Sequence, residues 1–151
     1  MIKNTVLPDE VFSIEQLQTV LNEIDQYIAT LNRKSQTPSY LGLLTKLIIE
    51  ANHIVELNTN ILGDLRNSLT KLIKDTSHLD IRTALPVLPN VQMRINDWVK
   101  NNVSKEVLLS FKTDHTLLAG VVIQTPKERY DHSLRNGLVS GRKYLVDEVK
   151  G

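Results

Sequence analysis

Two Asp-His pairs and one serine are the residues whose types could do chemistry. The stretch DHTLLAGVVIQTPKERYDHS contains Asp114-His115 and Asp131-His132, and Ser133 follows the second pair directly. A carboxylate beside an imidazole could ligate a metal ion or orient a general base. A serine between a strand and a helix could be a nucleophile. The elements that carry these side chains decide between these possibilities.

The predicted strands keep the two Asp-His pairs apart. If Thr125 to Glu128 closes a hairpin, the pairing register places His132 opposite Val121. His115 then lies about six residues further along, on the order of 20 Å away at about 3.3 Å per residue. Neighbouring residues in a strand point to opposite faces, so Asp131 cannot readily orient His132 as a triad acid would. The sequence therefore favours neither a metal site nor an acid-base pair.

Ser133, Asp114 and Gly120 have structural interpretations. Ser133 lacks the glycines of a GxSxG elbow and is predicted to cap a following helix, while Asp114 is predicted to make an Asx-type turn on a hairpin. Gly120, in LAGVV, has no phosphate-loop spacing, and a strand glycine marks a bulge or a close approach of another chain or helix. No residue set supports catalysis, so we expect no enzyme, no cofactor and no metal.

Composition excludes further classes of protein. The longest apolar run, LGLLTKLIIEA, contains Lys46 and Glu50 and falls short of the roughly 20 residues that a bilayer-spanning helix requires. The first ten residues lack the apolar stretch of a secretory signal. The net charge is +1 with dispersed basic residues and few aromatics, which argues against nucleic-acid binding. The chain has no cysteine, which fits a reducing compartment.

The first half is predicted to be helical, as a long-helix hairpin or a reduced helical bundle over residues 1–77. Ser13 and Gln16 form a capping-box pattern that starts one helix. From Ser39 to Lys74 the apolar residues alternate spacings of three and four, a period of 3.5 that is typical of an extended helix-helix seam, with Asn58 or Gly63 as possible breaks. The members of this seam are Leu41, Leu44, Ile48, Ala51, Val55, Leu62, Leu65, Leu69 and Leu72.

A second edge of this long helix carries Leu47, Ile54 and Ile61. These side chains complete an internal core if the two helices cover each other. Alternatively, they leave apolar surface for a partner helix, and the chain is then a coiled-coil adaptor or scaffold of some assembly. The sequence leaves both interpretations open.

The second half, residues 78–151, is predicted to be a small β-α-β-β-β-α sheet domain, so the chain as a whole is α+β. Alternating apolar residues from Leu79 indicate a strand, and Pro86 and Pro89 end it. A helix with an inward stripe follows, then two strands joined at Asp114 to Thr116, a short third strand and a last helix. The inward stripe is Val91, Ile95, Trp98 and Val99; the last helix has Leu134, Leu138 and Leu145 inward and Arg135, Arg142 and Lys143 outward.

The segment from Val107 to Leu145 resembles the C-terminal domain of the ATP synthase delta subunit, also called the oligomycin-sensitivity-conferring protein. The resemblance extends back through LDIRTALPVLPNVQMRINDWV and covers about half of the chain, whereas the first half is shorter than the family's N-terminal helical bundle. His132 departs from the glycine usual there. The matching positions are Asp114, Leu118, Ala119, Gly120, Val121, Asp131, Ser133, Arg135 and Leu138.

This resemblance implies a non-catalytic stator subunit of a bacterial F-type ATP synthase, cytoplasmic and peripheral to the inner face of the cell membrane. Its implied partners are a b-type peripheral-stalk subunit and the alpha subunits of the catalytic head, with no nucleic acid and no direct membrane insertion. The residues expected to contact partners are Gly120, Val121, Ser133, Arg135, Leu138, Arg142, Leu47, Ile54 and Ile61.

Overall fold

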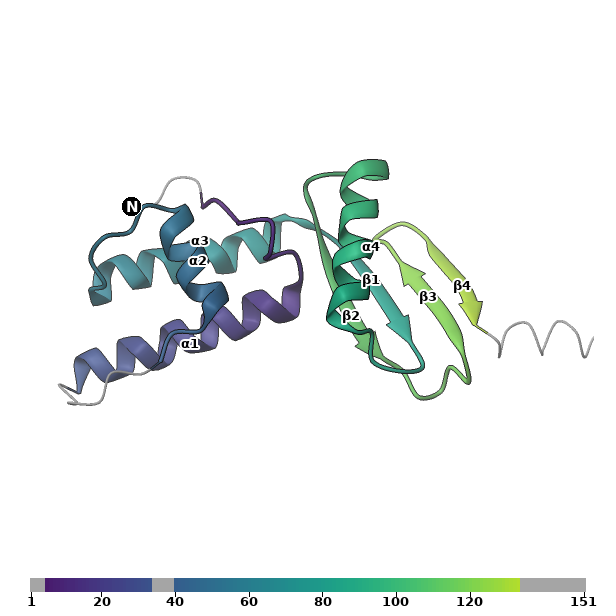
Figure 1. The fold of residues 1–151 in the computed structure, drawn as a ribbon, viewed down its shortest axis with the longest axis horizontal. Helices are drawn as coiled ribbons and strands as arrows, with labels where there is room; N and C mark the ends of the chain where they lie inside the picture. Colours follow the sequence, from purple (N-terminus) through teal and green to yellow (C-terminus); the bar gives the residue numbers. More distant parts are fainter. Residues whose placement is uncertain (1–4, 34–39, 134–151) are drawn as a thin grey trace, which may run out of the picture. The chain divides into compact units, whose positions relative to one another are not determined.

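The computed structural model describes residues 5–33 and 40–133, which fall into two compact units (Figure 1). One unit ends at Thr76 and the other begins at Ser77, one residue before the boundary placed from the sequence. The described residues form four helices and a four-stranded sheet. The predicted α+β class is therefore confirmed, while the predicted last helix lies outside the described residues.

Helix α1 (Ile14–Asn32) begins where the capping box places it. The Ser13 hydroxyl accepts a hydrogen bond from the Gln16 backbone N–H at 3.2 Å, and the Gln16 side chain accepts from the Ser13 N–H at 3.0 Å. These reciprocal bonds satisfy two backbone donors that a helix start otherwise leaves unpaired. The helix buries Leu17, Val20 and Ile24 completely, on the predicted apolar stripe.

The sequence left open whether Ser39 to Lys74 forms one continuous helix, with Asn58 as one possible break, and the described residues form two helices that are broken there. The structure has α2 (Leu43–Ala51) and α3 (Thr59–Asp75), separated by residues 52–58. His53 has a φ of 53°, in the left-handed region that ends a helix. Asn58 starts the next helix, since its side-chain oxygen accepts from the Ile61 N–H at 2.9 Å. The continuous coiled-coil seam, and with it the basis for the adaptor hypothesis, is absent from the described segment 40–76.

The first unit has its core between α1 and α3, which pack along each other. Their facing stripes repeat at helical spacing, so each helix covers the apolar face of its neighbour. The fully buried side chains on these two helices are Leu17, Val20, Ile24, Leu62, Leu65 and Leu69.

Helix α2 is held to α1 by a carboxylate. Glu23 of α1 accepts hydrogen bonds from the Gly42 backbone N–H, at 2.9 Å, and from the hydroxyl of the buried Thr45. Gly42 stands at the N-cap without a side chain of its own, and a Cβ there would lie 2.6 Å from a Glu23 oxygen. An acid from another helix thus does what a capping side chain does elsewhere.

The second unit is one mixed sheet with strand order β2-β1-β3-β4. Strand β1 (Ser77–Thr83) leads through α4 (Pro89–Asn102) to β2 (Val107–Thr113), which pairs with it in parallel. Strand β3 (Gly120–Gln124) pairs with the other edge of β1, and β4 (Arg129–Ser133) pairs with β3, both antiparallel. A parallel pair requires a crossover, and α4 supplies it.

Two predictions about pairing have opposite outcomes. The register of the β3–β4 hairpin is confirmed, since Val121 lies opposite His132. The hairpin expected at Asp114 to Thr116 is wrong, because β1 lies between β2 and β3. The chain instead crosses the end of β1, where the Asp114 N–H donates to the Thr83 carbonyl at 2.8 Å.

Candidate partner-binding surfaces

The two aspartates of the Asp-His pairs bind neighbouring hydroxyl residues. One Asp114 oxygen accepts from the Thr116 N–H and hydroxyl at 2.9 and 2.6 Å, which confirms the Asx-type turn. One Asp131 oxygen accepts from the Ser133 N–H and hydroxyl at 3.0 and 2.6 Å. Within residues 5–33 and 40–133, no three or more His, Asp or Glu side chains gather as a metal site would require. Both carboxylates therefore have local structural roles.

These bonds make the stability of the second unit depend on pH. The Ser133 side chain and N–H lower the pKa of Asp131 below its ordinary 3.8, because they stabilise the charged carboxylate. A depressed folded-state pKa contributes stability that is fully present above about pH 3.8 and is lost as the pH falls through the folded value.

We expect Asp131→Asn to lower the urea midpoint at pH 7, with the difference from wild type shrinking below pH 4. Fluorescence of Trp98, the single tryptophan, measures this midpoint in the second unit. Ser133→Ala removes the hydroxyl donor but keeps the backbone N–H donor, so this variant should retain part of the pH-dependent stabilisation. A difference in urea midpoint between Asp131→Asn and wild type that stays constant down to pH 2 would contradict this assignment.

Gly120 is required by the chain itself. Its φ is +94°, and a Cβ built on it would lie 2.3 Å from the His132 carbonyl oxygen and 2.8 Å from the Ser133 Cα. The close approach marked by this glycine is therefore that of β4. The same pairing leaves the Ser133 residue only 6% exposed, so its side chain has little surface to offer a partner.

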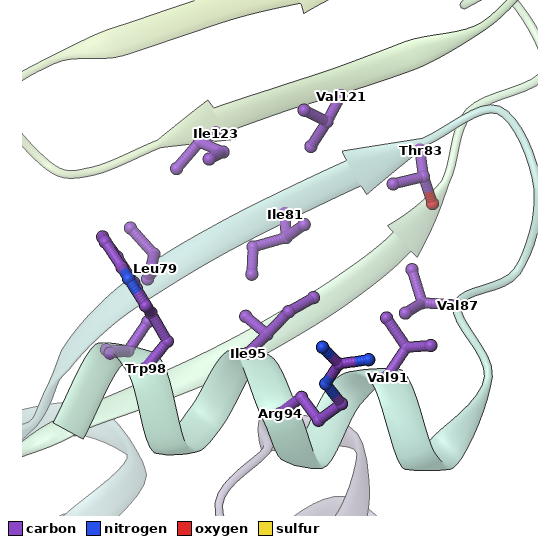
Figure 2. A pocket seen from close by; sticks show the side chains of 11 residues that line it. Leu79, Ile81, Thr83, Val87, Val91, Arg94, Ile95, Trp98, Val121 and Ile123 are labelled. Carbon is purple, nitrogen blue, oxygen red and sulfur yellow. The ribbon is translucent and has the colours of Figure 1, made fainter. Parts of the chain in front are cut away.

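Val121 belongs to an apolar groove on the second unit. The groove has a volume of about 630 Å³ and runs between α4 and the face of β1 and β3 (Figure 2). Trp98, from the predicted apolar stripe of this helix, lies on its wall and is 60% exposed, whereas Asn96 and Val99 of α4 are buried. The lining residues are Leu79, Ile81, Thr83, Val87, Val91, Arg94, Ile95, Trp98, Val99, Val121 and Ile123. The remaining predicted contacts of this unit, Arg135, Leu138 and Arg142, lie outside the described residues.

The structure does not place Leu47, Ile54 and Ile61 on one helical edge of the first unit, as the sequence had predicted. Leu47 lies in α2, Ile54 in the connection after it and Ile61 in α3, so the three half-buried side chains do not share one helix. Sequence reasoning missed Leu43, which stands four residues before Leu47 on α2 and is 70% exposed. Tyr40, just before α2, is also exposed, and the Lys46 amine lies 5.1 Å from the centre of its ring. We call Tyr40, Leu43 and Leu47 the α2 face.

Two compact units, each with exposed apolar side chains in its described part, are typical of a subunit of a larger assembly. None of the helices described is both long and apolar enough to cross a bilayer.

Comparison with known proteins identifies the family. The family model of the ATP synthase delta (OSCP) subunit matches residues 4–145, so the chain belongs to this family. The match includes both units, whereas the sequence resemblance had covered only the second.

Similar proteins agree with this assignment. The chain is 22% identical to ATP synthase subunit delta of Wigglesworthia glossinidia brevipalpis over 95% of this chain and 87% of that protein. It is 27% identical to ATP synthase subunit delta of Rickettsia bellii (strain OSU 85-389) over 53% of this chain and 44% of that protein. A chain in the cryoEM structure of Polytomella F-ATP synthase aligns with 48% of this chain and 92% of its own, at 19% identity and a TM-score of 0.40.

Membership of this family defines the function at the level of the complex. The chain is a non-catalytic stator subunit of the peripheral stalk of an F-type ATP synthase. The predicted family and the predicted absence of enzymatic activity are both confirmed by the family match.

Proposed function

We propose that the chain ties the peripheral stalk to the catalytic head, and so supports proton-driven ATP synthesis, with one unit for each attachment. The family match over both units carries this proposal. A stator must hold the head while the rotor turns, which requires two separate adhesive surfaces. The division of the chain at Thr76 into two compact units supports such an arrangement. The complex would lie at the cytoplasmic, inner face of a bacterial cell membrane.

The first unit would bind the alpha subunits of the head through the α2 face. Leu43 is largely exposed although it is apolar, and Leu47 continues the same side of the helix one turn further on. Apolar residues four apart on a helix are the anchors that a partner helix uses. The bonds from Glu23 to Gly42 and Thr45 hold α2 in place, so this face would be organised before binding.

The second unit would bind a b-type stalk subunit through the basic side of residues 134–151. Arg135 and Arg142 are seven residues apart, so they would fall on one side of the helix that the sequence predicts. Such a pair would meet acidic residues of a stalk helix and contribute to specificity and to the rate of association.

Titration calorimetry of the full chain against a peptide from the C-terminal end of the stalk subunit of the same organism tests the stalk attachment. We expect saturable binding that Arg135→Glu with Arg142→Glu weakens at least about tenfold, which corresponds to about 1.4 kcal/mol. The matched control is Lys105→Glu with Lys127→Glu, which makes the same charge change at two exposed positions of the second unit. Equal weakening in both double variants would mean that only net charge matters, and no binding by the folded wild-type protein would refute the attachment.

A further inference from the structure

Helix α2 buries a side that its pattern of apolar residues does not favour. At about 100° per residue, its apolar side chains form a continuous arc of roughly 140° around the helix axis. An amphipathic helix normally turns the middle of such an arc towards the core. Instead, Leu43 at one edge of the arc is 70% exposed, whereas Thr45, which lies outside the arc, is fully buried. The residues of the arc, in order around the axis, are Leu43, Leu47, Ala51, Leu44 and Ile48.

A rotation of α2 about its own axis would correct this mismatch. The side that α2 buries in the structure is formed by Thr45, Ile48 and Ile49. Turning the helix by roughly 120°, at about 100° per residue, would bring the middle of the apolar arc to the core. Leu47 would then be buried in place of Ile49, and the Thr45 hydroxyl would reach water. Burial of apolar side chains therefore does not select the rotation that the structure shows.

The carboxylate of Glu23 on α1 does favour the observed rotation. One of its oxygens accepts hydrogen bonds from the Gly42 backbone N–H, at 2.9 Å, and from the Thr45 hydroxyl. The N-cap Gly42 has no side chain to satisfy this end of the helix itself. A buried hydroxyl without a partner is costly, and bonds to a charged acceptor are stronger than neutral ones. Both bonds require Thr45 to face α1.

Asn52 makes a second polar contact on the same side of the helix. It stands seven residues, about two turns, after Thr45. Its side-chain oxygen accepts from the Val6 N–H at 2.9 Å, and its side-chain nitrogen donates to the Val6 carbonyl at 2.9 Å. Val11 and Phe12, further along the same segment, are buried and anchor it. The polar residues on the inward side of α2 are thus bonded at both ends of the helix.

We propose that Glu23 selects the rotation of α2 and is the positioning residue of the α2 face. With the Glu23 bonds in place, Leu43 and Leu47 stay turned away from α1, where the apolar stripe of a partner helix reaches them. Without these bonds, the rotation that buries Leu47 competes. The functional meaning of this inference rests on the proposed binding of the head by the α2 face, but the choice of rotation does not.

Thiol labelling measures the rotation without any partner, because the chain has no cysteine of its own. Leu47→Cys and Ile49→Cys are prepared singly in the full chain, each with and without Glu23→Ala, and their reaction rates with iodoacetamide are compared. We expect Glu23→Ala to slow labelling at position 47 at least about twofold, since half or more of the molecules would be rotated, and to accelerate labelling at position 49 at least about tenfold. Local unfolding of α2 would accelerate both reactions. Changes in the same direction, or no change, would overturn the proposal.

Two further variants separate the role of the bond from a general loss of packing. Gln26→Ala, which truncates an exposed side chain of the same helix α1, should leave both labelling rates unchanged. Glu23→Ala combined with Thr45→Val should return both rates towards the wild-type values, because a valine at this position gains by staying buried. Rates that remain at the Glu23→Ala level in this double variant would overturn the role given to Thr45.

Binding to the isolated catalytic head of the same organism connects the rotation to function. At unchanged circular dichroism, Glu23→Ala should weaken binding of the full chain at least about twofold, because only molecules with the α2 face outward bind. Unchanged affinity in a variant whose labelling has changed would overturn the positioning role. No binding by the wild-type chain would refute the head attachment itself, and the labelling rates would still decide whether Glu23 selects the rotation.

Discussion

Replacing Gly120 by valine is expected to destabilise the second unit by about 2–6 kcal/mol. Two costs combine at this residue. Its φ of +94° lies in a region that a β-branched residue adopts only with strain, which typically costs about 1–3 kcal/mol. The new Cβ would also meet two backbone atoms of β4, at 2.3 and 2.8 Å, and overpacking costs about 1–3 kcal/mol more. Backbone atoms cannot rotate away as a side chain can, so we expect β4 to separate from β3.

Urea unfolding followed by Trp98 fluorescence measures this effect within the second unit. Gly63→Ala is the matched control, because no atom lies within 4 Å of the added Cβ and the residue stands inside α3. That change should leave the Trp98 transition unchanged and stabilise α3 of the first unit by up to about 1 kcal/mol, the opposite sign, in the helical signal at 222 nm. A Gly120→Val protein with a wild-type unfolding midpoint would contradict the close approach of β4.

Leu65→Ala is expected to cost about 2–5 kcal/mol of unfolding free energy in the first unit. Leu65 is fully buried on α3, the helix that packs along α1. Truncation removes buried apolar surface and leaves a cavity that two rigid helices cannot fill completely. The effect should appear in the helical signal at 222 nm, because three of the four described helices belong to this unit.

Leu43→Ala provides the comparison for this experiment. It makes the same chemical change at a position that is 70% exposed, so its cost should stay within about 0.5 kcal/mol. Similar losses in the two variants would mean that the α1–α3 interface is not the core of the first unit.

Structural features that depend on residues close together in the chain were predicted correctly from the sequence. The Ser13 capping box, the division near Thr76 and the opposition of Val121 and His132 each depend on residues close together in the chain. The α+β class followed from the change of apolar period near the same boundary.

Long-range arrangements were not predictable in this way. Spacings of three and four do not distinguish one long helix from two helices that each bury their own stripe. Val55 was counted in the seam yet is 93% exposed in the connection, while Asn52, His53 and Asn58 carried the signal of the break. The insertion of β1 between β2 and β3 depends on pairing with residues about thirty positions earlier, such as Leu79 with Leu109, which no turn pattern reveals.

The sequence predicted that partner-binding surfaces exist, but it did not predict which residues and contacts form them. The sequence identified Gly120 as a place of close approach, and only the structure shows that β4 makes the approach. The spacing placed Trp98 on the apolar stripe of its helix, and the structure shows that this stripe lines the groove, with Trp98 still 60% exposed.

The measurement that tests the stator function most directly is ATP-driven proton pumping by membrane vesicles whose ATP synthase has been depleted of this subunit. Without a stator the head turns with the rotor, so ATP hydrolysis continues but proton movement fails. Adding the full chain should restore pumping toward the level of undepleted vesicles while hydrolysis by the head remains. A folded chain that leaves pumping at the depleted level would contradict the account.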